Sequence, residues 1–362
     1  MSVKNYVTLG RSGLRVSPLC LGTMTFGTEW GVGTAEEESF AILRQFLEAG
    51  GNFIDTANIY NFGTSEKMLG KFLRQEGGRD RTVLATKFTF NSSPGDPNAG
   101  GNGRKHIYQA LDASLQRLQT DYIDLYWMHA WDTYTPGEEV LSTLTDLVRA
   151  GKIRYYGFSN TPAWYVACIQ TAADLQSKER LIALQLQYSL ADRSIEREHI
   201  PVAQKLGLGI CPWSPLAGGF FSGKYKRESS GARGEGRLTG PAAAFFKGFT
   251  DRNWRILETV VDVAQHLSKA PAQVALNWAA TQPGITSTMI GATKPEQLAS
   301  NLSSLDFDIP ADLRARLEEA SAPELSGPYS YFSGVEHARV CGETSIQSWV
   351  PARLTGAPTV RK

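Results

Sequence analysis

The sequence has few cysteines, almost no excess charge and no long apolar run, and each shortage excludes a class of protein. Four cysteines occur in 362 residues and no two form a CxxC pair, which argues against a disulfide framework and against a zinc site. The formal net charge is +1, so the chain lacks the excess of basic residues that is typical of a nucleic-acid binder. No run reaches the roughly 18 apolar residues that a membrane-spanning helix needs. We therefore expect no metal, nucleic-acid or membrane partner.

The first residues of the chain, 1–13, contain no apolar stretch of the kind that a secretory signal carries. With few cysteines and no such stretch, we expect a cytoplasmic protein. The sequence makes no prediction of its oligomeric state.

Strand-like apolar runs alternate with helical segments along most of the chain, which favours a parallel sheet covered by helices. The runs are apolar without alternation, as in parallel strands that are buried on both faces. We expect eight strands, near residues 19–22, 52–55, 82–87, 123–128, 153–158, 182–187, 208–213 and 286–290. Eight β/α units predict an α/β protein with a closed (β/α)8 TIM barrel, which needs about 250 residues and more with insertions. One such barrel would span residues 1–362.

Some segments fall outside the repeat, and some helix starts are signalled locally. Residues 1–18 predict an N-terminal β-hairpin across the barrel bottom, 217–250 a long loop after the seventh strand, and 325–362 a C-terminal tail. Thr34, followed three residues later by Glu37, predicts a capping box. Pro136 and Pro271 each predict the first position of a helix.

Four polar residues follow three consecutive predicted strands, at the end of the barrel where catalytic groups collect. Lys87 beside Asp55 is costly to bury unless the two are paired. Tyrosine is a weak acid, with a reference pKa of about 10, and a nearby cation favours its phenolate. We therefore expect Tyr60 to protonate a carbonyl oxygen with help from Lys87 and Asp55, while His129 orients the carbonyl.

Several motifs resemble those of the aldo-keto reductase superfamily. The run 53–66, FIDTANIYNFGTSE, is similar to its signature, as are ATK at 85–87 and DYIDLY at 121–126 with His129. GKIR at 151–154 and GFSN at 157–160 extend the resemblance, which runs from about residue 6 to about residue 322. The segments WSPLAGG at 213–219 and SGKY at 222–225 resemble the potassium-channel β-subunit, bacterial Tas and aryl-alcohol dehydrogenase branches. This resemblance implies an NADPH cofactor and a catalytic tetrad of Asp55, Tyr60, Lys87 and His129.

The resemblance also implies residues for the cofactor. Ser159, Asn160 and Gln185 would bind the carboxamide, and Trp213 would stack on the nicotinamide ring. The full set of expected cofactor residues is Gly22, Thr23, Met24, Ser159, Asn160, Gln185, Trp213, Ser214, Pro215, Leu216, Gly218, Lys224, Arg233, Gly291, Ala292, Thr293, Gln297 and Asn301.

The adenosine end departs from the family pattern. Many members place a lysine and an arginine where this chain has Gly291 and Gln297. Lys294 is near, or Arg233 or Arg237 in the 217–250 loop would bind the 2′-phosphate instead, and NADP is expected over NAD.

We expect Trp30, Phe88 and Trp131 to form an aromatic substrate pocket. The predicted activity is NADPH-dependent reduction of an aldehyde or ketone to an alcohol. One alternative is a redox-sensing subunit that binds NADPH with little turnover. Another is an isomerase or aldolase that uses Lys87 as a Schiff base.

Overall fold

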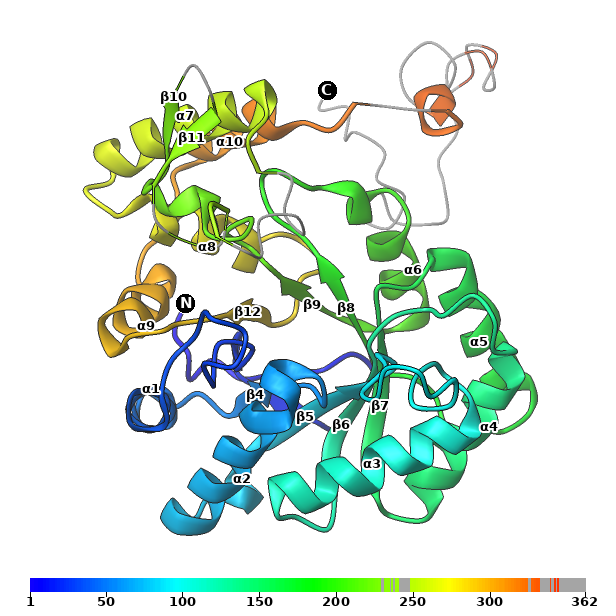
Figure 1. Ribbon diagram of the computed structural model, residues 1–362. Coiled ribbons are helices and arrows are strands. Elements are labelled where there is room, and N and C mark those ends of the chain that lie inside the picture. Colours follow the sequence, from blue (N-terminus) through cyan, green and yellow to red (C-terminus); the bar gives the residue numbers. More distant parts are fainter. Residues whose placement is uncertain are drawn as a thin grey trace.

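The computed structural model describes residues 1–228, 231–234, 236, 238–240, 248–324, 327–332, 339, 342 and 344. Eight parallel strands form one sheet in the order β12-β3-β4-β5-β6-β7-β8-β9 (Figure 1). These strands are β3 (Leu19–Gly22), β4 (Phe53–Asp55), β5 (Val83–Phe88), β6 (Ile123–Met128), β7 (Ile153–Ser159), β8 (Ala183–Gln187), β9 (Gly209–Trp213) and β12 (Thr288–Ile290). The predicted (β/α)8 barrel is confirmed, and each strand overlaps one predicted run.

The sheet closes by two different kinds of contact. β12 pairs with β3 in a parallel ladder, with Thr288 opposite Leu19. Between β9 and β12 the contact is irregular. The backbone N–H of Thr286 donates to the Ile210 carbonyl at 2.9 Å, and the N–H of Ile210 donates to the Thr286 hydroxyl at 3.2 Å. The last seam therefore depends on a side chain as well as on the backbone.

Helices follow the strands and surround the barrel (Figure 1). They are α1 (Glu36–Glu48), α2 (Thr64–Glu76), α3 (Arg104–Leu118), α4 (Gly137–Arg149), α5 (Ala163–Leu175), α6 (His199–Leu206), α8 (Pro271–Ala280) and α9 (Pro295–Leu302). Two further helices, α7 (Asp251–His266) and α10 (Ala311–Ser321), pack against each other outside the repeat.

The predicted helix starts are correct in one case of three. Pro271 is the first residue of α8, as expected. Pro136 is the N-cap of α4 and lies one position before its first residue. The capping box at Thr34 is wrong, because α1 has Ala35 as its N-cap and lacks a side-chain cap hydrogen bond. The Thr34 backbone instead bonds to the carbonyl of Thr25 and the N–H of Gly27, which keeps it out of the helix.

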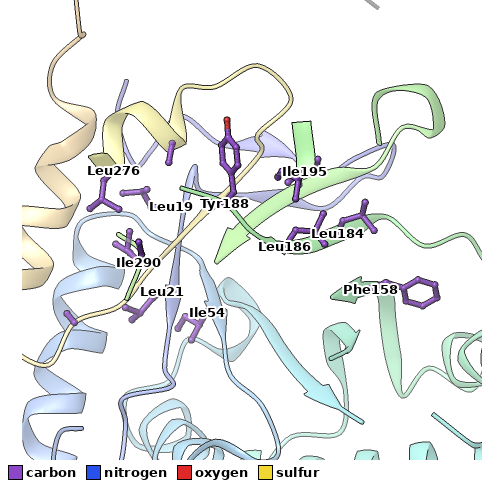
Figure 2. Close-up of a cluster of buried hydrophobic side chains, with 14 of the residues drawn as sticks. Leu19, Leu21, Ile54, Phe158, Leu184, Leu186, Tyr188, Ile195, Leu276 and Ile290 are labelled. Carbon is purple, nitrogen blue, oxygen red and sulfur yellow. The ribbon is translucent and has the colours of Figure 1, made fainter. Parts of the chain in front are cut away.

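Alternate residues of each strand enter two separate cores. Side chains that point outward pack under the helices, and Figure 2 shows Leu21, Ile54 and Leu184 in this outer cluster with Leu276 of α8. Side chains that point inward fill the barrel interior at the end that the N-terminal hairpin covers. This inner cluster consists of Leu9, Val16, Cys20, Phe53, Val83, Ala85, Leu125, Trp127, Ile182, Ala183, Cys211 and Met289. The alternation follows from the period of two along a strand.

The N-terminal hairpin closes the lower end of the barrel, as predicted. Its strands β1 (Val7–Thr8) and β2 (Arg15–Val16) are antiparallel, and the hairpin supplies Leu9 and Val16 to the inner cluster. Its tip approaches the barrel so closely that a Cβ at Gly10 would lie 2.2 Å from the Ile182 carbonyl oxygen. Gly10 also has a φ of +60°, so glycine is required there on two grounds.

The 217–250 loop and the C-terminal tail are described in part. The loop contains a short 3-10 helix, η4 (Phe220–Ser222), and an antiparallel pair, β10 (Lys226–Glu228) and β11 (Gly231–Arg233). Arg237 lies outside the described residues. In the tail, η7 (Tyr329–Phe332) is anchored by the Tyr329 hydroxyl, which donates to Glu198 at 2.5 Å. No helix in the described part is long and apolar enough to cross a membrane.

Candidate active site

Three of the predicted catalytic residues meet around one ammonium at the C-terminal ends of β4 and β5. Lys87 Nζ donates to the Asp55 carboxylate, to the Thr56 carbonyl at 2.7 Å and to the Tyr60 hydroxyl at 3.1 Å. The Lys87 side chain is fully buried and that of Asp55 is 2% exposed. All three donor positions of the ammonium therefore have partners without water.

The charges of this pair follow from its surroundings. Burial raises the pKa of Asp55, and the Lys87 ammonium opposes that rise. Burial alone would lower the pKa of Lys87, but Asp55 and Tyr60 raise it above its ordinary value. Gln185 Nε2 donates to the second Asp55 oxygen at 3.0 Å. The site therefore holds a charged lysine whose ammonium stabilises negative charge on the Tyr60 oxygen.

A strained turn fixes the position of Tyr60. Tyr60 opens η1 (Tyr60–Gly63), and the next residue, Asn61, has a φ of 46°, which non-glycine residues seldom adopt. The side-chain amide of the buried Asn61 donates to the carbonyls of Met24 and Phe26 at 3.2 and 3.0 Å. Its oxygen accepts from the backbone N–H of Trp30 at 3.1 Å. Asn61 thus ties the Tyr60 turn to the loop after β3. The sequence reasoning missed this role, although asparagine is among the residues that tolerate a positive φ.

His129 follows β6 and faces Tyr60. The two rings lie edge to face, with centroids 5.9 Å apart. Burial lowers the pKa of His129 well below its ordinary value, and the Lys87 ammonium lowers it further. The imidazole is therefore neutral at pH 7 and can offer one N–H to a carbonyl oxygen.

Aromatic rings surround this group, but they are not all the ones predicted. Trp30 lies edge-on to Tyr60 at 6.1 Å, and Trp131 packs against Trp164 at 5.4 Å. Phe88 is excluded from the substrate pocket, since it is fully buried in the outer cluster. Its neighbour Lys87 points into the barrel, so Phe88 must point toward the helices.

Phe90, and not Phe88, is the phenylalanine that lies against the catalytic group. Its ring lies 4.5 Å from that of His129, and the residue is 44% exposed. β5 ends at Phe88, and the chain turns away from the strand direction at Thr89, which has a φ of 104°. Strand alternation alone would have excluded Phe88, but the turn at Thr89 has no signal in the sequence.

The residues predicted to hold the carboxamide lie directly beside the catalytic group. Ser159, the last residue of β7, pairs in register with Gln185 in the middle of β8, and both are buried. Asn160 Nδ2 donates to the His129 carbonyl at 3.0 Å, and the Trp213 indole N–H donates to Asn160 Oδ1 at 3.1 Å. The structure therefore brings these four residues together with His129 and Asp55.

Two glycines at this rim could carry a Cβ without a clash. A Cβ at Gly22 would meet nothing nearer than the Ile290 carbonyl oxygen at 3.6 Å, and one at Gly291 nothing nearer than the Gly22 oxygen at 3.9 Å. Thr23 and Met24 continue from Gly22, and both have structural contacts. The Thr23 N–H donates to the Asp55 carbonyl at 2.9 Å, and the Met24 carbonyl accepts from Asn61.

A tight turn after β9 carries the residues predicted for the pyrophosphate. Positive φ angles occur at Ser214, Ala217, Gly218 and Gly219, and the Gly218 N–H donates to the Ser214 hydroxyl at 2.8 Å. Lys224 lies over the turn, since its Nζ would be 3.8 Å from a Cβ at Gly219. The other two predicted residues in this turn are Pro215 and Leu216. Arg233 is exposed on β11.

The residues predicted for the adenosine end form one corner at the start of α9. Gln297 Oε1 accepts from the Thr293 N–H at 2.9 Å and from its hydroxyl at 3.1 Å. Asn301 Nδ2 donates to the Gly291 carbonyl at 3.1 Å, and the Ala292 carbonyl accepts from Thr25 at 3.0 Å. Lys294, the N-cap of α9, is exposed at the same corner.

Comparison with known proteins identifies the family of this chain. The model of the aldo/keto reductase family matches residues 18–322, which include every strand of the barrel. The chain belongs to the aldo/keto reductase family. It is therefore an oxidoreductase, and its similarity to named aryl-alcohol dehydrogenases places it near that branch of the family.

Similar proteins come from bacteria and fungi. The chain is 38% identical over 324 residues to the uncharacterized oxidoreductase YrpG of Bacillus subtilis, which covers 87% of this chain and 95% of that protein. It is 35% identical over 329 residues to norsolorinic acid reductase stcV of Emericella nidulans, with 88% and 82% covered. It is 32% identical over 334 residues to an aryl-alcohol dehydrogenase (NADP+) of Phanerodontia chrysosporium, with 88% and 86% covered.

Proposed function

We propose that this aldo/keto reductase uses NADPH to reduce an aromatic aldehyde or ketone to the alcohol, with Tyr60 as the proton donor. The observation that carries the proposal is the buried Lys87 ammonium, which bonds to the Tyr60 hydroxyl and the Asp55 carboxylate at once. The names of an aryl-alcohol dehydrogenase and a norsolorinic acid reductase among the similar proteins support an aromatic substrate. So do the rings of Trp30 and Phe90, which flank Tyr60 and His129.

The proton transfer follows from the charges of the site. Tyr60 gives its hydroxyl proton to the carbonyl oxygen, and the Lys87 ammonium 3.1 Å away stabilises the phenolate that remains. Asp55 keeps Lys87 charged and fixed in place. Neutral His129 donates a hydrogen bond to the same carbonyl oxygen and so orients it. Lys87 thus acts as a cation and His129 as a neutral imidazole, the states that the shifts of their pKa values favour.

The residues around this group fit a dinucleotide. Gly22 and Gly291 present backbone without side chains at this rim. Ser159, Asn160 and Gln185 offer polar groups for a carboxamide, and Trp213 offers an indole ring. When bound, NADPH supplies the hydride. Selectivity for NADP would rest on the exposed cations Lys224, Arg233 and Lys294, because Gly291 and Gln297 bring no charge to the adenosine corner.

Tyr60→Phe tests the proposal, with Tyr134→Phe as a matched control on an 89% exposed tyrosine. We expect Tyr60→Phe to lower kcat by about 10²–10⁴-fold, the usual contribution of a general acid, while NADPH affinity stays within about twofold. Turnover of an aromatic aldehyde panel would be measured by NADPH absorbance, and NADPH binding by fluorescence. Near-normal turnover by Tyr60→Phe would refute the assignment. A wild-type protein that binds NADPH but turns over no carbonyl would favour the redox-sensing alternative.

The Schiff-base alternative conflicts with the charge of Lys87. An amine attacks a carbonyl only when it is neutral, and the pKa of Lys87 is raised by Asp55 and Tyr60 against the effect of burial. All three donor positions of the ammonium are also committed to Asp55, Thr56 and Tyr60. We therefore do not propose an aldolase or isomerase.

A further inference from the structure

Thr89, the first residue after β5, has a backbone conformation that is unusual for its residue type. Its φ is 104°, and a β-branched residue adopts such a positive φ only under strain. The residue is buried, with 7% of its surface exposed. Strain of this kind persists only where the surrounding contacts hold it, and it is concentrated at functional sites. The contacts of Thr89 therefore indicate which part of the site it serves.

The Thr89 hydroxyl connects His129 to the segment that precedes α3. It accepts from the His129 N–H at 3.1 Å, a donor that is shared with the Phe88 carbonyl at 3.2 Å. The same hydroxyl donates to Asn102 Oδ1 at 2.7 Å, and Asn102 Nδ2 donates to the Ala130 carbonyl at 2.9 Å. Asn102 is 1% exposed, so these bonds form without bulk water. Thr89 and Asn102 together hold the backbone of His129 and of the residue that follows it.

The backbone of Thr89 also fixes the position of Phe90. The Gly101 N–H donates to the Thr89 carbonyl at 2.7 Å, so the loop 90–100 begins and ends at one fixed point. Phe90 is the first residue of this loop, and its ring lies 4.5 Å from that of His129. Thr89 therefore determines where the imidazole and the phenyl ring lie relative to each other.

We propose that Thr89 is a positioning residue for carbonyl reduction, whose hydroxyl places His129 against the carbonyl oxygen and whose backbone places Phe90 beside the substrate ring. The inference rests on the proposed function, in which His129 and Phe90 contact the substrate. The Thr89 hydroxyl is committed to His129 and Asn102, so it acts through His129 and not on the substrate itself. A displacement of about 1 Å at a catalytic group can lower turnover about 10²-fold.

Four variants test this proposal on the full chain. Thr89→Val deletes the hydroxyl but keeps the β-branched shape, whereas Thr89→Ser keeps the hydroxyl. Thr89→Gly also deletes the hydroxyl but adopts the positive φ without strain, so it provides a second test if the valine variant fails to fold. Thr143→Val is the matched control, because Thr143 is fully buried in α4 and its hydroxyl donates to the Glu139 carbonyl at 2.7 Å.

Turnover of benzaldehyde is the first readout. We expect Thr89→Val and Thr89→Gly to lower kcat/KM by about 10–10²-fold, through a lower kcat from the displaced His129 and a higher KM from the displaced Phe90. Their NADPH affinity and their far-UV circular dichroism should match those of the wild-type protein. Thr89→Ser and Thr143→Val should keep the kcat/KM of the wild-type protein.

Hydrogen exchange is a second readout that does not depend on turnover. The His129 N–H, followed by mass spectrometry of fragments that contain it, should exchange faster in Thr89→Val and Thr89→Gly than in the wild-type protein or Thr89→Ser. If the wild-type protein reduces no carbonyl, the proposed function fails, and exchange alone decides whether Thr89 holds His129. Unchanged exchange in Thr89→Val would overturn the proposal, and so would unchanged turnover beside an active wild-type protein. Equal losses in Thr89→Ser or Thr143→Val would show a general packing effect and overturn it as well.

Discussion

Replacement of Lys87 by methionine is the most demanding test of the buried ion pair. The variant leaves the Asp55 carboxylate in a site that is 2% exposed, where the Gln185 amide still donates to it at 3.0 Å but no longer has a cation beside it. Removal of one partner of a buried pair costs about 3–5 kcal/mol, because the other charge stays buried and uncompensated. We expect Lys87→Met to lower the free energy of unfolding by about that amount at neutral pH, measured by urea denaturation.

The loss should depend on pH in a defined direction. Burial raises the pKa of Asp55 above its unfolded value of about 3.9, and Lys87→Met removes the charge that opposes this rise. A group with a raised folded pKa stabilises the protein at low pH, and this contribution is lost as the pH rises through the folded pKa. Lys87→Met should therefore be closer to wild type at about pH 5 than at about pH 8.

Two further variants separate the ion pair from other effects of substitution. Addition of Asp55→Asn to Lys87→Met removes the stranded charge and should recover more than about half of the loss. Lys71→Met breaks an exposed pair with Glu36 and should cost less than about 1 kcal/mol. A cost for Lys87→Met no larger than that for Lys71→Met would refute the reasoning. So would a double variant as unstable as the single one.

Three other predictions follow from the barrel and its mouth. Gly157→Ala puts a Cβ 2.4 Å from the Trp127 ring and should cost about 1–3 kcal/mol in urea denaturation, whereas Gly13→Ala, with open space, should be nearly neutral. Burial and the Lys87 ammonium lower the pKa of His129, so its stabilising contribution is present above about pH 6.5 and is lost as the pH falls. His129→Gln should therefore flatten the acid side of the stability curve. Phe90→Ala should raise KM for benzaldehyde about two- to tenfold, since an aromatic contact is worth about 0.5–1.5 kcal/mol.

The barrel could be predicted because its strands are buried on both faces and therefore read as continuous apolar runs. The β/α repeat did not predict α7, an extra helix that lies in the chain between β9 and α8. The capping box at Thr34 matched a local pattern, but the backbone bonds of Thr34 to Thr25 and Gly27 belong to the loop after β3. Long-range pairing of that kind outweighs a local signal.

The catalytic group could be predicted because strand ends converge at one rim of a barrel. The structure brings Asp55, Lys87 and Tyr60 together as expected. The roles of these residues stay predictions. The left-handed turn at Asn61 had a weak signal, because asparagine tolerates a positive φ, whereas the positive φ at Thr89 had none.

The pairing of β3 with β12 has a consequence for the nascent chain during synthesis. β3 ends at Gly22, but β12, the strand that pairs with its other edge, is complete only at Ile290. During synthesis, both edge strands of the growing sheet therefore stay unpaired until β12 has been made, and exposed edge strands favour aggregation. A chain that ends before β12 would therefore be an aggregation-prone fragment and not a smaller enzyme. Folding during synthesis should depend on chaperones that cover the unpaired edge strands.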